Sequence, residues 1–368
     1  MSRVLVAMSG GVDSSVAAAL LIADGHEVVG ATMKLWGGDS DSGCCSVADV
    51  EDARRVAQQL GIAHHVFNFG SDFDAHVVEP YVAAHAEGRT PNPCVECNRH
   101  LKFDRFLRRA TQLGFDAVAT GHHARVVRHP AGGRYRLRRG VDQAKDQSYV
   151  LHMLDQAALA RTLLPVGALT KAEVRTRAAD LGLRTAAKPD SQDVCFITST
   201  GGRHAFLGSR IPLRPGLVID DDSGEVMGSV PAVELVTVGQ RRGLGDAGDA
   251  RRRYVVDVDL AAATVTVGPR PPMMERLAVG GLTWVDEPVA AGASVLVQCS
   301  AHGDAVPAVF DVDGESDGEV DGAGAGVRFE QPHRVVAPGQ SVVLYDGDDV
   351  LGGGVALASA SALADGRL

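Results

Sequence analysis

Apolar and polar positions alternate in blocks along the first two hundred residues. Residues 3–8 (RVLVAM) form an apolar run, followed by a glycine- and serine-rich loop and by SSVAAALLIADG, a helix-like stretch closed by Gly25. Three strand-like patterns alternate with a helical pattern at 46–61; they lie at 26–33, 64–69 and 117–123. Short strands alternating with helices of this length predict a Rossmann-like parallel α/β sheet, whose ligands bind at the carboxyl ends of the strands.

The pattern changes after about residue 205. Short strand-like runs there are separated by Pro, Asp-Gly and Gly-rich turns, which indicates one or two small β-rich domains. Pro269, Pro271 and Pro272 mark a linker between them. A low-complexity acidic stretch, 311–326, has the composition of a solvated loop, and no function can be argued for it.

Composition limits the class of protein. A chain of 368 residues predicts two or three domains. No apolar run reaches the roughly 18 residues that a membrane span needs, and MSRVLVAMSGG is not a signal peptide, so we expect a cytoplasmic protein whose six cysteines are reduced. The net charge of -10 argues against a general nucleic-acid coat. It does not exclude a nucleic-acid enzyme, because basic residues cluster at 99–109, 125–139 and 241–253.

The loop after the first strand has the features of a phosphate site. Paired glycines and the start of a helix favour an anion, and serines add hydroxyl donors. The loop lacks the lysine of a Walker A motif and the third glycine of the dinucleotide fingerprint. S-G-G-x-D-S after an N-terminal strand is instead the signature of pyrophosphate-loop ATPases, which cleave ATP between the α and β phosphates. The predicted nucleotide residues are Ala7, Met8, Ser9, Gly10, Gly11, Val12, Asp13 and Ser14.

Two further positions complete the predicted ATP site. The backbone of Met33, at the end of the second strand, is placed to meet the adenine, and Gly121 is placed to close the pocket. Asp13 would organise the loop or a Mg²⁺ ion. Taken alone, a Gly-Gly turn is often only a connection, and Met33 would be a core residue.

The cysteines leave several interpretations open. Cys94 and Cys97 have the spacing of zinc ligands, but no second pair accompanies them, because Cys44 and Cys45 are adjacent and Cys299 stands alone. No metal site is therefore predicted from spacing. Cys195 follows the polar run Asp190–Asp193, which favours an exposed functional loop over the packed core residue that a lone cysteine usually is.

Together these segments resemble the tRNA-specific 2-thiouridylases, the bacterial enzymes that replace the C2 oxygen of the wobble uridine with sulfur. The matching segments run in order along nearly the whole chain: MSGGVDSSV, GRTPNPCVECNRHLKF, ATGHHAR, KDQSYVL, KPDSQDVCFI, TVGQRRGL and PGQSVVLYDGDDVLGGG. The resemblance implies a pyrophosphate-loop fold of the adenine nucleotide alpha hydrolase-like class. Its domains would be a catalytic domain at 1–204, a small central β-rich domain at 205–272 and a C-terminal β-barrel for tRNA docking at 273–368.

The resemblance also implies a mechanism. ATP would adenylate the uracil C2 oxygen, and a cysteine desulfurase or sulfur-relay protein would load Cys195 as a persulfide. Cys97 would then attack that persulfide and release sulfide, or the persulfide would attack carbon and Cys97 would resolve the product. Both routes require thiolates, which a nearby cation such as Arg99 would favour.

RNA contacts follow from the same resemblance. Three residues match the segment around the target base, which must leave its stack: Asn92, Pro93 and Cys94. Three more match a tRNA-contacting segment: Lys145, Asp146 and Gln147. The arginine runs at 125–139 and 241–253 would add affinity for the RNA backbone.

Three alternatives remain at this stage. Some members of the family carry Asp where this chain has Cys94, which puts the proton acceptor in doubt. Cys94, Cys97 and Cys195 together could hold an iron–sulfur cluster. The chain could also be another pyrophosphate-loop ATPase, a nucleotide-binding sensor or a persulfide carrier. The cysteine pair argues against another pyrophosphate-loop ATPase, and the ATP loop argues against a protein that only carries persulfide.

Overall fold

The structure is a computed structural model, and it describes residues 1–35, 46–129, 132–190, 194–197, 201–244, 252–312 and 324–358. Cys44, Cys45, residues 191–193 of the polar run and most of the acidic stretch lie outside these ranges. No helix in the described part of the chain combines the length and apolar character needed to cross a membrane.

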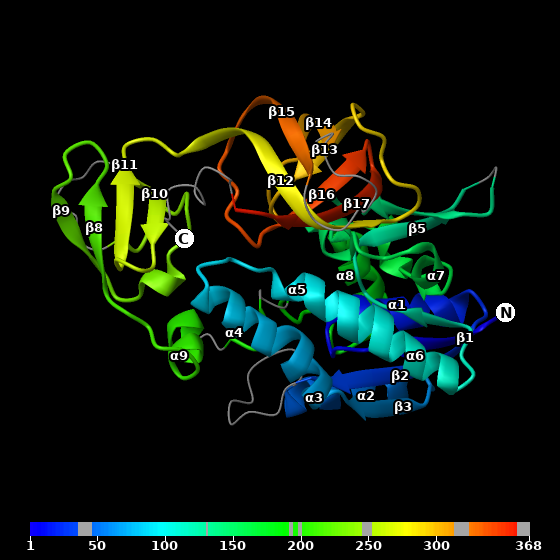
Figure 1. Cartoon of the computed structure of the whole chain (residues 1–368). Coiled ribbons are helices and arrows are strands. Elements are labelled where there is room, and N and C mark those ends of the chain that lie inside the picture. The colour runs from blue at the N-terminus through cyan, green and yellow to red at the C-terminus, as the bar shows by residue number, and fades with distance from the viewer. Residues whose placement is uncertain are drawn as a thin grey trace.

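The N-terminal domain is built on a five-stranded parallel sheet (Figure 1). In spatial order its strands are β3 (His64–Asn68), β2 (Glu27–Lys34), β1 (Arg3–Ala7), β4 (Ala117–Ala119) and β7 (Thr162–Leu163). β1 is buried on both faces: Val4 and Val6 enter one hydrophobic cluster, and Leu5 and Ala7 enter another. This explains why the run is continuously apolar rather than alternating.

Helices cover both faces of this sheet. One face packs against α1 (Val12–Ala23), α2 (Val47–Gln59) and α8 (Lys171–Asp180). The other packs against α3 (Gly70–Phe73), α4 (Glu79–Ala86) and α6 (Phe106–Gln112). The remaining helices are α5 (Pro93–Glu96), α7 (Gln156–Leu159) and α9 (Gly202–Gly208). The 3-10 and π helices are η1 (Asp74–Val78), η2 (Cys97–Arg105), η3 (Gln143–Lys145), η4 (Ser148–Leu151), η5 (Pro165–Ala168) and η6 (Val233–Leu235).

Two β-rich units follow. The smaller is a four-stranded sheet in the order β10 (Tyr254–Asp259), β11 (Thr264–Gly268), β8 (Gly216–Asp220) and β9 (Val226–Val230). The larger is a closed antiparallel barrel in the order β12 (Met273–Trp284), β15 (Ala325–Arg334), β14 (Val306–Val312), β13 (Ser294–Gln298), β16 (Ser341–Asp346) and β17 (Asp349–Ala356), which β12 closes by pairing with β17. The predicted fold class is thereby confirmed.

One hairpin departs from the alternating pattern of the first two hundred residues. β5 (Ala124–Arg128) and β6 (Tyr135–Arg139) are antiparallel, and β6 pairs with β17 of the barrel. The hairpin forms because Leu137 is fully buried in a cluster that also contains Val350 of the barrel. In Figure 1 the barrel lies over this side of the N-terminal domain, and the central sheet lies beside it.

Candidate active site

The predicted phosphate loop joins β1 to the N-terminus of α1. Gly10 has φ of +73°, and a Cβ there would come within 2.3 Å of the Asp49 carbonyl oxygen, so a glycine is required. The Ser14 and Ser15 hydroxyls donate to the Gly11 carbonyl at 3.2 and 2.7 Å. Gly11 is the N-cap and has no side chain to occupy the first N–H groups of α1, which suits an anion.

Gly121 lies directly against this loop. A Cβ at Gly121 would come within 2.5 Å of the Ser14 nitrogen and 2.9 Å of the Asp13 Cβ. The backbone after β4 can therefore reach the start of α1 only without a side chain at this position. The structure brings Gly121 together with Asp13 and Ser14, as a closed pocket needs.

Asp13 is held by two cationic or polar partners. Its carboxylate accepts from Lys171 Nζ at 2.7 and 2.8 Å and lies 3.1 Å from His123 Nε2. Burial would raise the pKa of Asp13, but the hydrogen bonds from His123 and Lys171 outweigh it and keep that pKa below its ordinary value. Asp13 is thus ionised and joins the start of α1 to Lys171 and His123.

Lys171 also joins the loop to a second carboxylate. Its Nζ lies 2.9 Å from Asp190 Oδ1, which Arg175 contacts at 2.8 Å, and Lys145 contacts Asp190 Oδ2 at 2.9 Å. Burial acts to raise the pKa of Asp190, and the bonds from Lys145 and Lys171 lower it well below the ordinary range. One carboxylate at the start of the Cys195 segment is therefore linked to the nucleotide loop and to the predicted RNA segment.

Lys188 makes a parallel connection to the same loop. Its Nζ donates to the Gly10 carbonyl at 3.0 Å and pairs with Asp49 and Asp52 at 2.7 and 2.8 Å. The sequence predicted no role for His123, Lys171 or Lys188. Lys171 begins α8 behind a capping box of Thr170 and Glu173, which signals a helix start but not a contact with Asp13.

Most of the other predicted nucleotide residues are buried, and Ser9 is the exposed one. Ala7 and Met8 are 8% and 2% exposed at the end of β1, and Met8 N donates to the Ala31 carbonyl at 2.8 Å. The Met33 side chain belongs to the hydrophobic cluster on the α6 side of the sheet, at the carboxyl end of β2. Ser9 is exposed and Val12 is buried.

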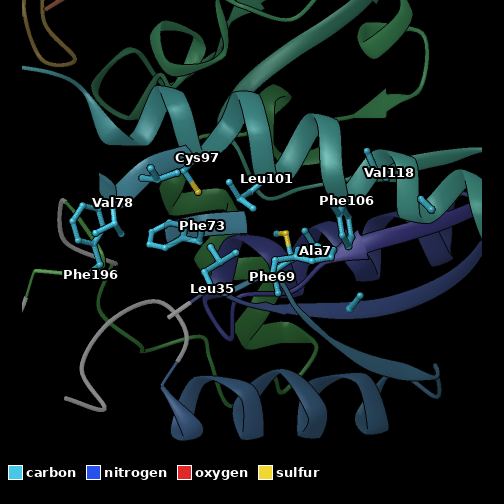
Figure 2. Close-up of a cluster of buried hydrophobic side chains, with 14 of the residues drawn as sticks. Ala7, Leu35, Phe69, Phe73, Val78, Cys97, Leu101, Phe106, Val118 and Phe196 are labelled. Carbon is cyan, nitrogen blue, oxygen red and sulfur yellow. The ribbon is translucent and has the colours of Figure 1, made fainter. Parts of the chain in front are cut away.

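The same cluster contains Cys97 and is contacted by Cys195. Cys97, at the start of η2, is buried in it with Phe73 and Phe196 (Figure 2). Cys195 is partly buried and packs against the same cluster. Phe196 contacts Phe73 and Tyr81 edge-on, with ring centroids 5.6 and 5.5 Å apart. Two cysteines about a hundred residues apart in sequence are therefore brought to one cluster, which also contains Ala7 at the end of β1.

Local geometry distinguishes the Cys195 segment. Val194 has φ of +47°, a conformation that costs a β-branched residue about 1–3 kcal/mol and that is concentrated at functional sites. In the described residues no three His, Cys, Asp or Glu side chains gather as metal ligands.

The predicted RNA residues divide into two groups. Asn92 accepts from Cys94 N at 3.1 Å and caps α5, Pro93 is buried, and Cys94 is half-buried. Of the second group, the Lys145 side chain is 43% exposed, and Gln147 Oε1 accepts from His123 N at 2.9 Å.

Asp146 is engaged inside the protein. Its carboxylate accepts from Gly140 N at 2.8 Å and from the Ser148 hydroxyl at 2.8 Å, and it pairs with Arg139 at 3.1 Å. Its side chain is only 6% exposed. Asp146 therefore stabilises the turn that presents its two neighbours.

The arginine run at 125–139 pairs with the barrel. Arg125 contacts Asp348 at 3.0 Å, and Arg136 and Arg138 contact Asp349 at 2.7 and 2.5 Å. Near the cysteines, Arg99 lies 3.6 Å from Glu96. The expectation that the run supplies RNA affinity stays a prediction, since these guanidinium groups already have carboxylate partners.

Comparisons with known proteins cover the whole chain. A family model described as the tRNA methyl transferase HUP domain matches residues 2–199, one described as the tRNA methyl transferase PRC-barrel domain matches 204–269, and one described as the aminomethyltransferase beta-barrel domain matches 274–356. The tRNA-specific 2-thiouridylase MnmA of Chloroflexus aurantiacus is 47% identical over 361 residues, which cover 96% of this chain and 98% of the relative. The protein of the same name from Chloroflexus aggregans is 48% identical over 362 residues, with the same coverage.

Two solved structures share lower similarity. A 4-thiouridine synthetase in complex with RNA and ATP is 18% identical, with a TM-score of 0.37 over 53% of this chain and 45% of that one. The U34-tRNA thiolase NcsA from Methanococcus maripaludis, solved with its [4Fe-4S] cluster, is also 18% identical, with a TM-score of 0.35 over 51% of this chain and 60% of that one.

Proposed function

Because this chain belongs to the family of tRNA-specific 2-thiouridylases, we propose that it is a tRNA-uridine 2-sulfurtransferase that uses ATP to thiolate the wobble uridine of lysine, glutamate and glutamine tRNAs. The observation that carries the proposal is the shared cluster that joins Cys97, the Cys195 segment and the end of β1. Activation of a carbonyl oxygen and delivery of sulfur need one location, and the phosphate loop starts where that cluster meets β1.

The first half of the reaction would occur at the loop of residues 7–14. The uracil C2 oxygen attacks the α-phosphorus of ATP, pyrophosphate leaves, and the C2 oxygen becomes part of an AMP leaving group. The N–H groups of α1 would hold the phosphates, and Lys171 would offset their charge. Mg²⁺ would neutralise the phosphates, and Asp13, at the start of α1, is the carboxylate that would help to hold it.

The second half would use the two cysteines. A persulfide on Cys195 is attacked at its inner sulfur by the Cys97 thiolate, which forms a Cys97–Cys195 disulfide and expels hydrosulfide. Hydrosulfide adds to C2, AMP leaves, and loss of the sulfur proton gives 2-thiouridine. A thiol reductant then restores both cysteines. In the alternative order the terminal persulfide sulfur attacks C2, and Cys97 afterwards breaks the S–S bond.

The partners follow from this chemistry. tRNA is the substrate, and the sulfur would arrive from a cysteine desulfurase or a sulfur-relay protein. We also propose the division into a catalytic domain at 1–204, a central domain at 205–272 and a C-terminal barrel at 273–368. The parallel sheet, the four-stranded sheet and the closed barrel support that division, and the β5–β6 hairpin of the first domain is the part that pairs with the barrel.

Mass spectrometry of nucleosides tests the proposal. Unmodified glutamate tRNA is incubated anaerobically with the protein, Mg-ATP, a desulfurase and cysteine, beside reactions with Cys97→Ser, Cys195→Ser and Cys94→Ser. We expect 2-thiouridine in the wild type and none with the first two variants, while Cys299→Ser serves as the matched control. The result with Cys94→Ser decides whether that thiol takes part. Release of AMP without any 2-thiouridine would reject the substrate or the donor.

Two rival chemistries are decided by a parallel reaction with S-adenosylmethionine and by the iron content of the purified proteins. A methylated uridine formed from added S-adenosylmethionine would favour the activity in the family model's name, and its mass differs from that of 2-thiouridine. Iron that copurifies anaerobically with the protein and is lost in Cys94→Ser would favour the cluster-dependent reaction.

A further inference from the structure

The segment that leads to the C-x-x-C motif is held by both other domains. Thr90 N donates to the Pro338 carbonyl at 2.8 Å, and Gln340 Nε2 donates to the Thr90 carbonyl at 2.8 Å. The Thr90 hydroxyl lies 3.2 Å from that of Thr237, which precedes β10. Thr90 therefore uses its backbone groups to contact the barrel and its side chain to contact the central domain.

The barrel side of this contact is a rigid turn between β15 and β16. Gly339 N donates to the Ala356 carbonyl at 2.9 Å, and Ala356 N donates to the Gln340 carbonyl at 2.8 Å, which fixes the turn to β17. Gly339 has φ of +90°, and a Cβ there would lie 3.1 Å from Thr90 N. The turn and Thr90 thus meet backbone to backbone, which leaves little room for either to shift.

The chain between Thr90 and the cysteines is stiff. Pro91 and Pro93 have fixed φ angles, and the Asn92 side chain accepts from Cys94 N. Further on, Asn98 is fully buried and donates to the Val150 carbonyl at 2.9 Å. A displacement at Thr90 is therefore passed on to Cys94 and Cys97 rather than absorbed by free torsions.

We propose that Gln340 and Gly339 are positioning residues for the Cys97 thiol, so that the barrel holds the sulfur chemistry in place through Thr90. The claim that this contact affects catalysis rests on the proposed function. The claim that it fixes the position of Cys97 rests on the contacts alone. Displacing a reacting atom by about 1 Å can lower the rate about a hundredfold. Loss of the hydrogen bond from Gln340 to the Thr90 carbonyl is therefore expected to slow the reaction.

The test is Gln340→Glu, with Gln340→Met as a second variant. Glu keeps the size of the side chain but replaces the donor with a carboxylate that faces the Thr90 carbonyl, and Met removes the donor without adding charge. The matched controls are Gln58→Glu and Gln58→Met, because Gln58 is exposed on α2. The first readout is the rate of iodoacetamide alkylation at Cys97, followed by peptide mass spectrometry without tRNA or ATP.

We expect both Gln340 variants to alkylate Cys97 several-fold faster than the wild type, while Cys299 in the barrel keeps its rate. In the thiolation assay we expect kcat to fall about tenfold with KM for tRNA unchanged. Wild-type alkylation and kcat in both variants would overturn the proposal, and so would an equal rise at Cys299, which would mean general loosening of the barrel. If the wild type did not thiolate tRNA, the proposed function would fail while the alkylation result would still decide whether Gln340 positions Cys97.

Discussion

His152 should make the junction between the N-terminal domain and the barrel sensitive to acid. It is 1% exposed, its Nδ1 lies 2.9 Å from the Tyr149 carbonyl, and a Cβ on Gly353 of β17 would lie 2.8 Å from its ring. Burial lowers the pKa of His152 from 6.5 to about 4, against a small rise from the Tyr149 carbonyl. The perturbation that isolates this group is His152→Gln, a neutral side chain that keeps a donor.

The sign and size of the effect follow from linkage. In the unfolded chain the imidazole takes up a proton below about pH 6.5, whereas the folded protein takes it up only near pH 4, so acid favours unfolding. Stability is complete above about pH 6.5 and declines as the pH falls towards 4. Each pH unit corresponds to about 1.4 kcal/mol. His152 should therefore lower the free energy of unfolding by roughly 1.4 kcal/mol at pH 5.5 and by about 3 kcal/mol at pH 4, relative to neutral pH.

Urea unfolding at pH 7.5 and pH 5.5 measures this effect. The two tryptophans are Trp36 and Trp284, so a Trp36→Phe background leaves a single fluorophore in the barrel. The change in unfolding free energy between the two pH values should be about 1.4 kcal/mol larger in the protein that keeps His152 than in the His152→Gln variant, whose amide does not titrate. Equal changes in the two proteins would refute the reasoning, because the acid sensitivity would then arise from other groups.

Three further predictions concern the nucleotide loop and the barrel contact. Gly121→Ala should weaken ATP binding about tenfold in calorimetry, because its Cβ would meet Ser14 N, with tRNA affinity as the control; an unchanged Kd for ATP would contradict this. Lys171→Met should raise the pKa of Asp13, so that ATP cleavage is lost at a higher pH on acidification, and superimposable pH profiles would contradict it. Tyr149→Phe removes a buried hydrogen bond to the Ser341 carbonyl and should lower unfolding free energy by about 1–2 kcal/mol; an unchanged urea midpoint would argue against that contribution.

Local patterns predicted the strands and helices of the N-terminal sheet that depend mainly on residues close to one another in the sequence. β1, α1, β2 and α2 follow the apolar periodicity closely, and Gly25 and Gly61 close the helices with φ of +79° and +72°. β4 ends at Ala119, earlier than the strand expected to 123. It ends there because Gly121 must approach Ser14, and the Thr120 hydroxyl lies 2.7 Å from His122 Nδ1 in a turn.

Long-range pairing is what the sequence could not show. The β5–β6 hairpin has the composition of a basic surface, and only its pairing with β17, more than two hundred residues later, explains why Leu137 lies in a core. The same holds for Asp13 and Lys171, which are 158 residues apart. The motifs predicted which segments matter, but which charges meet depends on the fold. The catalytic roles of Cys97 and Cys195 remain predictions.

The charges around the site suggest how anions are selected there. Lys145 and Lys171 are two of the cations near the predicted phosphate loop, and both are already paired with carboxylates: Lys145 with Asp190, and Lys171 with Asp13 and Asp190. A phosphate that binds to either lysine therefore competes with a carboxylate as well as with water. Such an exchange yields little net Coulomb energy for a stray anion, because an existing ion pair is lost when the new one forms and the anion gives up its own hydration. A ligand that supplies several phosphates and a base at once can exceed this cost, which favours a nucleotide or an RNA over a single small anion at this edge of the sheet.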